Sequence, residues 1–232
     1  MDQLRLLVVA DIHSNLPALE GVLEDAGRFD AAVCAGDIVG YGPDPGECIR
    51  RAAERSFRCV SGNHDAAIVT GDTSWFNPYA AAAVDINRRL VGGADRAWLR
   101  GLPAKLTLNM EAVKVAVFHG SPLDPLNEYV FPPEAELRAA EFLDLSGADL
   151  LILGHTHVPY IIRSGRRWML NPGSVGQPRD GDPRASYMVV DLEGGAVDVA
   201  HRRVEYDVEG VATRMLRLGL PEVLAVRLFH GR

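Results

Sequence analysis

Short apolar runs that end in histidine, aspartate or asparagine recur along this 232-residue chain and constrain its fold more than any other feature. The clearest run, residues 150–153, follows a Gly-Ala-Asp turn and leads into Gly-His-Thr-His. An unbroken apolar run of this kind is typical of a strand buried on both faces, where an unsatisfied polar group is costly. We therefore expect His155 and His157 at the end of the strand, where residues two apart point to the same side and can share one metal ion.

The first part of the chain alternates between strand-like and helical patterns. Strands are predicted at 4–10, 31–35 and 57–60. Between them, one helical stretch is opened by Asn15 and Pro17, and a second runs from Asp44, as an acidic cap with Pro45 in the first turn, to about residue 55. This alternation predicts a parallel sheet in an α/β protein.

The rest of the chain predicts further helices and antiparallel pairs. Residues 75–101 have a helical pattern with Asn77 as cap, 105–109 and 113–118 form a hairpin, and 133–145 form a helix. Residues 160–206 indicate four strands in two antiparallel pairs, followed by an amphipathic helix at 207–218. The apolar tail after Pro221 is either a packed helix or an interface element. No linker divides the chain, so residues 1–232 are expected to form one domain.

Composition excludes several classes of protein. Hydrophobic residues make up 47% and charged residues 24%, which is typical of a globular chain. A net charge of −7 argues against a protein that holds long nucleic acid. The sequence lacks the pattern of a signal peptide and any run of membrane-spanning length, so we expect a cytoplasmic protein with no membrane partner. Three cysteines without a CxxC pair are expected to be buried apolar residues.

Polar residues with ligand chemistry close five of the predicted strands. They are Asp11, His13, Asp37, Asn63, His64, His119, His155 and His157. In an open parallel sheet the carboxyl ends of the strands share one edge, so these residues are expected to meet. Carboxylates can bridge two ions, and imidazoles select transition metals over Ca²⁺ and Mg²⁺. The sequence therefore predicts a site for two divalent transition metal ions.

Each of these motifs alone has an ordinary structural explanation. Asp11-x-His13 is compatible with a turn or a helix cap, and the stretch 62–65 is compatible with a tight turn. A fold does not need an imidazole at every strand end, however, and five of the seven histidines lie at these positions. The joint pattern therefore favours a functional site.

In order and residue type the motifs resemble those of the calcineurin-like metallophosphoesterase superfamily: D-x-H, G-D, G-N-H-[DE], H-G and G-H-x-H, from Asp11 to His157. The resemblance implies a four-layer αββα sandwich of two mixed β-sheets flanked by helices, an α/β fold (α+β in some schemes). It also implies two metal sites that share Asp37. Asp11, His13, Asp37 and His157 would hold one metal, and Asp37, Asn63, His119 and His155 the other. Mn is favoured, with Fe, Zn, Ni and Co as alternatives.

The resemblance implies hydrolysis of a phosphate ester. Two cations can deprotonate a bridging water and neutralise the phosphoryl oxygens, which allows hydroxide to attack phosphorus in line. His64 lies next to the ligand Asn63 and matches the residue that protonates the leaving oxygen in the family.

Two departures from the family pattern bear on the substrate. Protein phosphatases, and similarly diadenosine tetraphosphate hydrolases, have an arginine that binds phosphate at the position of Tyr41. The phosphatases also have an aspartate that orients the catalytic histidine, at the position of Gly40. Loss of the arginine disfavours a phosphomonoester dianion. Arg179 and Arg184 are candidates to replace that cation, with Tyr41 as a further candidate substrate contact.

We therefore expect a phosphodiesterase that acts on a small or nucleotide-like ester. The alternatives are a phosphomonoesterase or protein phosphatase, a dinucleoside polyphosphate hydrolase and, from another class, a non-catalytic interaction module. Five aromatic residues are candidates for a wall against a base or leaving group, with core packing as the alternative: Trp75, Phe76, Tyr79, Tyr129 and Phe131. Trp98 and Trp168 are expected in the core. The oligomeric state is left open.

Overall fold

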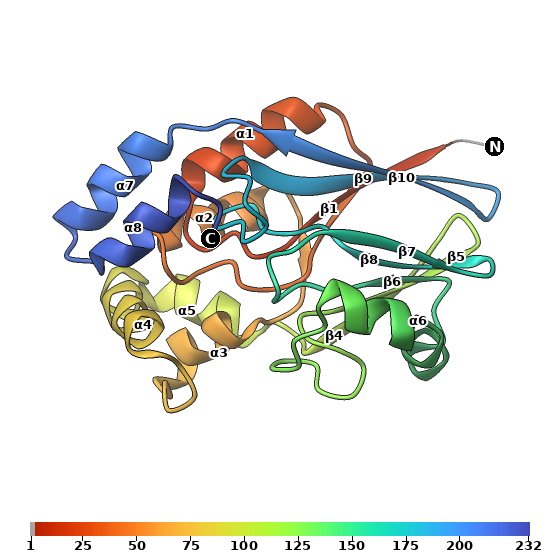
Figure 1. The fold of residues 1–232 in the computed structure, drawn as a ribbon, viewed down its shortest axis with the longest axis horizontal. Coiled ribbons are helices and arrows are strands. Elements are labelled where there is room, and N and C mark those ends of the chain that lie inside the picture. The colour runs from red at the N-terminus through yellow and green to blue at the C-terminus, as the bar shows by residue number, and fades with distance from the viewer. Residues whose placement is uncertain (1–2) are drawn as a thin grey trace.

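The computed structural model describes residues 3–232, which form two five-stranded mixed sheets packed face to face (Figure 1). The first sheet has the strand order β10-β9-β1-β2-β3. Its parallel strands are β1 (Leu4–Val9), β2 (Ala31–Cys34) and β3 (Arg58–Cys59), and its antiparallel strands are β9 (Ala185–Glu193) and β10 (Ala196–Val204). The predicted parallel alternation is confirmed.

The second sheet has the order β4-β5-β6-β8-β7. Parallel strands β5 (Val113–Phe118), β6 (Leu150–Ile152) and β8 (Arg167–Asn171) lie at its centre, between antiparallel β4 (Lys105–Met110) and β7 (Tyr160–Ser164). The three predicted antiparallel pairs, β4–β5, β7–β8 and β9–β10, are confirmed. The last two pairs belong to different sheets, because the chain crosses from the second sheet to the first between β8 and β9.

Helices cover the outer faces of both sheets. Helices α1 (Leu16–Ala26), α2 (Pro45–Glu54), α3 (Asn63–Thr70), α4 (Pro78–Leu90) and α5 (Gly93–Arg100) lie on the side of the first sheet. Helix α6 (Pro132–Ser146) covers the second sheet, and α7 (Val208–Arg217) and α8 (Glu222–Leu228) pack together beside α4. The predicted four-layer sandwich of helices and mixed sheets is confirmed.

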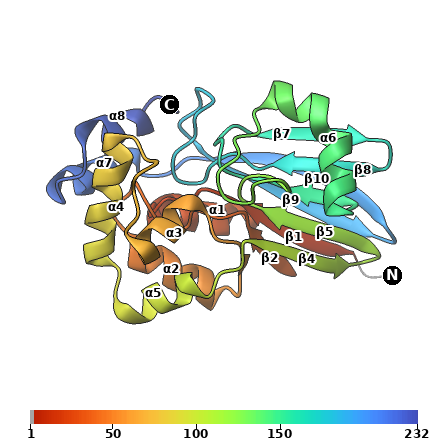
Figure 2. The same ribbon diagram turned by 90° about the horizontal axis from the view of Figure 1, so that it is seen from below.

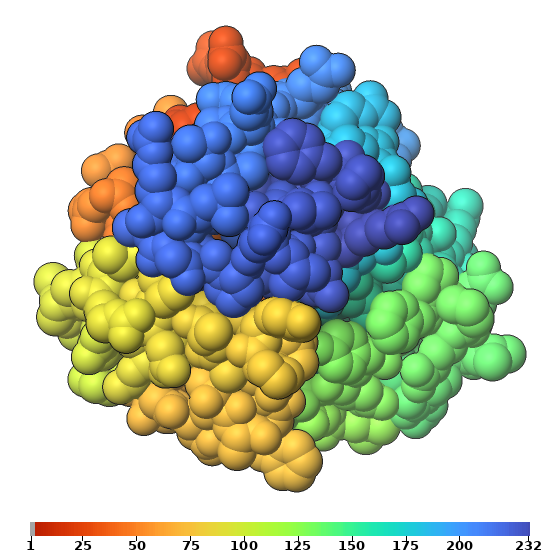
Figure 3. Space-filling model, turned by 60° about the vertical axis from the view of Figure 1, so that its left-hand side comes forward, coloured from red at the N-terminus to blue at the C-terminus, as the bar shows by residue number. Residues whose placement is uncertain are grey.

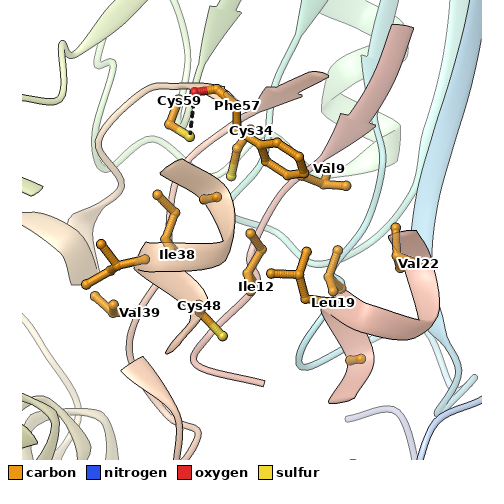
Figure 4. Close-up of a cluster of buried hydrophobic side chains, with 14 of the residues drawn as sticks. Val9, Ile12, Leu19, Val22, Cys34, Ile38, Val39, Cys48, Phe57 and Cys59 are labelled. Carbon is orange, nitrogen blue, oxygen red and sulfur yellow. Dashed lines mark hydrogen bonds between the residues drawn. The ribbon is translucent and has the colours of Figure 1, made fainter. Parts of the chain in front are cut away.

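Alternating side chains of β1 fill two different layers of the core. Leu6 and Val8 pack between the sheets, whereas Leu7 and Val9 pack against the helices. Figure 4 shows the helical layer, where Val9 and Cys34 lie with Leu19 of α1. Full burial of each such side chain contributes roughly 1.5–3 kcal/mol to stability. All three cysteines are free and buried in this layer, as predicted.

Some local predictions were incomplete or wrong. Helix α3 was not predicted, and the helical stretch 75–101 consists of two helices separated by Val91 and Gly92. Asp44 occupies the N-cap position of α2 but makes no capping hydrogen bond; its Oδ1 pairs with Arg214 of α7 at 2.7 Å. The tail after Pro221 is the packed helix α8.

The helices of the first layer and the C-terminal pair gather at one end of the molecule, with most of the strands at the other (Figure 2). The parallel strands of both sheets point their carboxyl ends toward the helical end, so the loops that follow them meet there. No helix within residues 3–232 has the length and apolar character needed to cross a membrane.

Candidate metal centre

The loops after β1, β2, β3, β5 and β6 bring together all seven predicted metal ligands and His64. Six of the seven ligands are at most 4% exposed: Asp11, His13, Asp37, His119, His155 and His157. Their side chains form overlapping groups in which the candidate ligand atoms lie within 4.8 Å of one another. The first sheet supplies both aspartates and Asn63, and the second supplies His119, His155 and His157, so the site forms only where the two sheets meet.

One group consists of Asp11, His13 and His157. The Nε2 atoms of His13 and His157 are 3.0 Å apart. Asp11 Oδ1 lies 3.7 Å from Nε2 of His13 and 3.4 Å from Nε2 of His157. Three ligand atoms therefore face one small space.

The second group consists of Asp37, His119 and His155. Asp37 Oδ2 lies 3.4 Å from His119 Nε2 and also 3.7 Å from His13 Nε2 of the first group. Asn63 Oδ1 is 3.0 Å from His119 Nε2. Asp37 thus lies between the groups, which is the position expected of a bridging carboxylate.

Backbone carbonyls orient the imidazole rings. The Nδ1 atoms of His13, His119 and His157 lie 3.1, 2.8 and 2.6 Å from the carbonyl oxygens of Val39, Ala35 and Gln177. An N–H at Nδ1 that donates to these carbonyls leaves Nε2 as the lone-pair atom. His155 has the opposite arrangement, because its Nε2 lies 3.2 Å from the carbonyl of Asn127. Each ring therefore presents one nitrogen lone pair to the site.

These donors fit divalent metal ions. When both Nδ1 atoms donate, the Nε2 lone pairs of His13 and His157 face each other without a proton between them and repel each other. A cation bound to both nitrogens would remove this repulsion. Asp11 Oδ1 is buried without a hydrogen-bond partner among the described residues. Burial raises the pKa of Asp11 to about 8 and lowers the pKa of His13 and of His157 well below the usual range. The imidazoles of His13 and His157 are therefore in the neutral state that metals require, whereas Asp11 would lose its proton when a cation binds.

Asp37 and His119 stabilise each other's charged forms. Burial alone would raise the pKa of Asp37, but His119 and the other histidines hold it well below its usual range. Burial likewise opposes protonation of His119, while Asp37 raises the pKa of His119 to about 9. Asp37 is therefore the carboxylate of this site that stays ionised most readily.

Left-handed backbone conformations are concentrated at the ligands. The φ angles are +53° at Asp11, +47° at His13, +53° at Asp37, +68° at His155 and +60° at His157. Non-glycine residues seldom adopt positive φ, and such strain persists where the surrounding structure enforces it, typically at functional sites.

Buried hydrogen bonds hold the ligand loops in place. Asp65 accepts from the backbone N–H groups of Ile38, Val39 and Gly62, and His64 N donates to Asp37 Oδ1 at 2.8 Å. Asn171 donates to the carbonyl of Gly154, and Ser174 to the carbonyl of Asp11. The sequence analysis did not identify Asp65 as a support of these loops.

The second support that the sequence analysis missed is Asn87 of α4. Its Oδ1 accepts from Ser14 Oγ and Gly40 N, and its Nδ2 donates to the carbonyl of Gly42. A signal for it exists in the sequence, since Asn87 follows Ala80, Ala83 and Val84 at the spacing of the buried face of a helix. A polar residue on such a face needs hydrogen-bond partners.

His64 lies among the ligands and forms a third group with His13 and Asp37, in which the candidate ligand atoms are within 4.8 Å of one another. Its ring packs against Tyr41, with ring centroids 4.4 Å apart, and edge-on against Phe76 at 4.7 Å. Nδ1 is buried and has no hydrogen-bond partner among the described residues, and a Cβ at Gly40 would overlap it. Burial lowers the pKa of His64 to about 4.

Arg179 reaches the site through Tyr41. Its Nη2 donates to Tyr41 Oη at 3.2 Å and to Gln177 Oε1 at 2.9 Å, while its Nε is buried without a partner among residues 3–232. The structure does not bring Arg184 to the site. Arg184 pairs with Asp182 at 2.6 Å and borders a separate surface hollow with Pro183 and Glu205.

A cavity of about 440 Å³ opens beside the metal centre. Its walls include Asn63, His64 and His155. Of the five aromatic candidates, Trp75, Phe76 and Tyr129 line it; Phe131 stacks on Tyr129 at 5.9 Å, and Tyr79 is half exposed. Trp98 and Trp168 are partly buried against the hydrophobic core, as expected.

Comparison with known proteins agrees with this geometry. The model of the calcineurin-like phosphoesterase superfamily domain matches residues 4–195. A crystallised metallophosphoesterase from Sphaerobacter thermophilus is 37% identical, with full coverage of both chains and a TM-score of 0.86. An uncharacterised protein from Methanocaldococcus jannaschii is 33% identical over 98% of both chains. The phosphodiesterase YfcE of Escherichia coli K12 is 29% identical over 81% of this chain and 88% of its own.

A sandwich of two mixed sheets with clustered histidines and aspartates at the strand ends defines a metal-dependent phosphoesterase. The chain belongs to the calcineurin-like phosphoesterase superfamily, and its His/Asp groups could hold the divalent metals that this family uses.

Proposed function

We propose that this protein is a dinuclear metal-dependent phosphodiesterase that acts on small or nucleotide-like esters. The observation that carries the proposal is the position of Asp37 between two His/Asp groups, with Oδ2 3.7 Å from Nε2 of His13 and 3.4 Å from Nε2 of His119, beside a cavity large enough for an ester group. Pockets of roughly 300–1,000 Å³ hold small organic ligands.

Each group would hold one divalent cation, with Mn²⁺ favoured. Asp11, His13 and His157 would hold the first, and His119, His155 and Asn63 the second, with Asp37 shared. When bound, the two cations supply an activated water as nucleophile and neutralise charge on the phosphoryl oxygens.

Arg179 and His64 would act on the substrate itself. Within the described part of the chain the Nε of Arg179 has no partner, and the guanidinium lies over the ring of Tyr41. Arg179 would therefore bind a phosphoryl oxygen, in place of the arginine that protein phosphatases have where this chain has Tyr41. His64 faces the cavity and would protonate the leaving oxygen. The negative phosphate beside His64 would raise its pKa from the low value that burial imposes.

Two observations favour a diester over a polyphosphate. Of the residues that line the cavity within the described chain, none is lysine or arginine, so the cavity suits an uncharged ester group. YfcE, a relative by sequence, is named a phosphodiesterase. Arg179 supports a phosphomonoesterase as the second candidate, because a cation near the metals also suits a dianion.

The C-terminal helices support one domain over residues 1–232. The family model ends at residue 195, yet α7 and α8 pack with Tyr41 and with Ala80 and Ala83 of α4 in one buried cluster. We propose that this unit takes a small phosphate ester as its partner and does not bind long nucleic acid, in keeping with its charge of −7.

The test is a comparison of initial rates on bis-p-nitrophenyl phosphate and p-nitrophenyl phosphate. Metal-stripped protein would be reloaded with Mn²⁺, Zn²⁺ or Ni²⁺ in turn. The proposal predicts metal-dependent turnover with a higher kcat/KM for the diester. A higher value for the monoester would replace it with the second candidate, and absence of turnover with every metal would reject both.

A further inference from the structure

The cavity beside the metal centre has flat aromatic surfaces from two separate segments. Trp75 and Phe76 come from the loop between α3 and α4, and Tyr129 comes from the segment between β5 and α6. Figure 3 shows the gold segment that contains α3 lying beside the green segment after β5, below the blue C-terminal helices.

The first surface combines an anchored ring with an exposed one. Phe76 packs edge-on against His64 and against the helical core layer, which fixes the loop. Its neighbour Trp75 is 94% exposed, although it borders the cavity. The Trp75 indole is therefore available to contact a flat ligand group at the cavity.

The opposite surface is already stacked. The ring of Tyr129 lies parallel to His155, with centroids 3.7 Å apart and 20° between the planes, and Phe131 lies parallel to Tyr129 at 9°. These contacts hold the Tyr129 ring in one orientation beside a candidate metal ligand. A flat ligand group entering the cavity therefore meets the held rings of Phe76 and Tyr129 and the exposed ring of Trp75.

Polar residues on the cavity wall are already engaged within the protein. Asn77 Oδ1 accepts from the backbone N–H groups of Tyr79 and Ala80, and Asp124 Oδ1 accepts from those of Leu126 and Asn127. The aromatic faces are therefore the groups that bind the plane of a base, whichever base it is. The cavity lining within residues 3–232 contains no lysine or arginine, so no second phosphate is recognised there.

We infer that this cavity binds a nucleobase or similar planar aromatic group carried by the leaving alcohol of the substrate. The inference rests on the proposed function and specifies its substrate class. Because His64 forms part of the cavity wall, the group bound there is attached to the oxygen that His64 protonates. Water forms the new bond to phosphorus, the P–O bond to the aromatic-bearing alcohol breaks, and the proton moves to the departing oxygen.

The test compares two phosphate esters that differ only in the base. Adenosine 5′-monophosphate and ribose 5-phosphate would be titrated calorimetrically into Mn²⁺-loaded protein, with the fluorescence of exposed Trp75 as a second readout. The phosphate anchors both ligands equally, so the difference reports the base. We expect adenosine monophosphate to bind roughly tenfold or more tightly, the effect typical of a stacked base.

Three variants locate this preference. Trp75→Ala is expected to remove most of it, and Trp75→Phe to retain most of it because a ring remains. Leu137→Ala, a control at an 86% exposed residue on α6, is expected to leave it unchanged.

Equal affinities for the two esters, or a preference that Trp75→Ala does not alter, would overturn the inference. Hydrolysis of bis-p-nitrophenyl phosphate by the same sample tests the proposed function separately. Retained metal-dependent hydrolysis without a base preference would reject the aromatic pocket alone. Absence of both hydrolysis and ester binding would reject the pocket and the proposed function together.

Discussion

Two arginines in the loop between β8 and β9 have different surroundings. Arg179 bonds to Tyr41 beside the metal centre, whereas Arg184 pairs with Asp182 at the surface. We predict that Arg179→Met lowers kcat/KM for a diester about 10- to 100-fold, the loss expected for charge-assisted hydrogen bonds of about 1.5–3 kcal/mol. Arg184→Met, the matched control, should stay within about twofold of wild type. Steady-state kinetics measure both; equal effects would exclude a specific role for Arg179.

His64 is the residue whose role depends most on the leaving group. We predict that His64→Ala retains both metals, because its imidazole is not in the proposed ligand set, and loses roughly 10²–10⁴-fold in turnover of an ester with a poor leaving group. The loss should be smaller with p-nitrophenolate, which departs without a proton. Metal analysis and kinetics on both ester types check this. Near wild-type turnover of the poor ester would show that another group donates the proton.

The positions of the ligands could be predicted from the sequence, but their backbone conformations could not. Asp11 and His157 close apolar strands, and this pattern alone indicated that they would meet. The positive φ angles at both residues arise from tertiary contacts, since neither is a residue type that requires them. The interaction between Arg179 and Tyr41 joins segments 138 residues apart, and no local pattern predicts such a contact.

At the scale of elements, close approach between the start of α3 and the loop after β2 requires glycine at position 62. A Cβ there would overlap the carboxylate and the backbone of Asp37. We predict that Gly62→Ala displaces Asp37, reduces bound metal and costs about 1–3 kcal/mol through overpacking. The control is Gly93→Ala at the start of α5, where an added Cβ meets no atom within 4 Å. Metal content and thermal unfolding distinguish them; full metal binding by Gly62→Ala would contradict this geometry.

The pair between Asp44 of α2 and Arg214 of α7 links two helices. Burial raises the pKa of Asp44 above its usual value, and Arg214 partly offsets this effect. Ionisation of Asp44 therefore costs stability as the pH rises through its folded pKa, and Arg214 reduces that cost. Because the Arg214 side chain is 41% exposed, we predict that Arg214→Met destabilises the protein by only about 1 kcal/mol at pH 7.

This difference should shrink as the pH falls and Asp44 becomes protonated in both proteins. Urea unfolding of wild type and Arg214→Met at a series of pH values measures it. A difference that is the same at every pH would show that Arg214 acts through packing and not through its charge.

Long periodic elements were predictable because burial imposes their period. Helix α3 was missed because its cap Gly62 and first residue Asn63 are typical of a turn, and the helix has only eight residues. The break between α4 and α5 was missed because the helical pattern continues on both sides of Val91 and Gly92. Asp44 was a reasonable cap by residue type, but its Oδ1 pairs with Arg214 and its side chain makes no capping hydrogen bond.

At the scale of the whole molecule, the candidate centre depends on the packing of two sheets. The first sheet contributes Asp11, Asp37 and Asn63, and the second contributes His119 and the two histidines after β6. The layer between the sheets contains a closely packed apolar cluster, in which residues such as Val8 and Ile152 are fully buried, so it fixes the distance between the two half-sites. Metal binding and folding are therefore expected to stabilise each other.

The most direct measurement of the central claim is a titration of metal-stripped protein with Mn²⁺, in which bound metal and diester hydrolysis are followed together. We predict that activity rises until two equivalents are bound per chain, since Asp37 lies between two His/Asp groups that would each hold one cation. The same titration of Asp37→Asn should show weaker binding and little activity. Full activity at one equivalent, or unchanged activity after the metal is removed, would contradict a dinuclear phosphodiesterase.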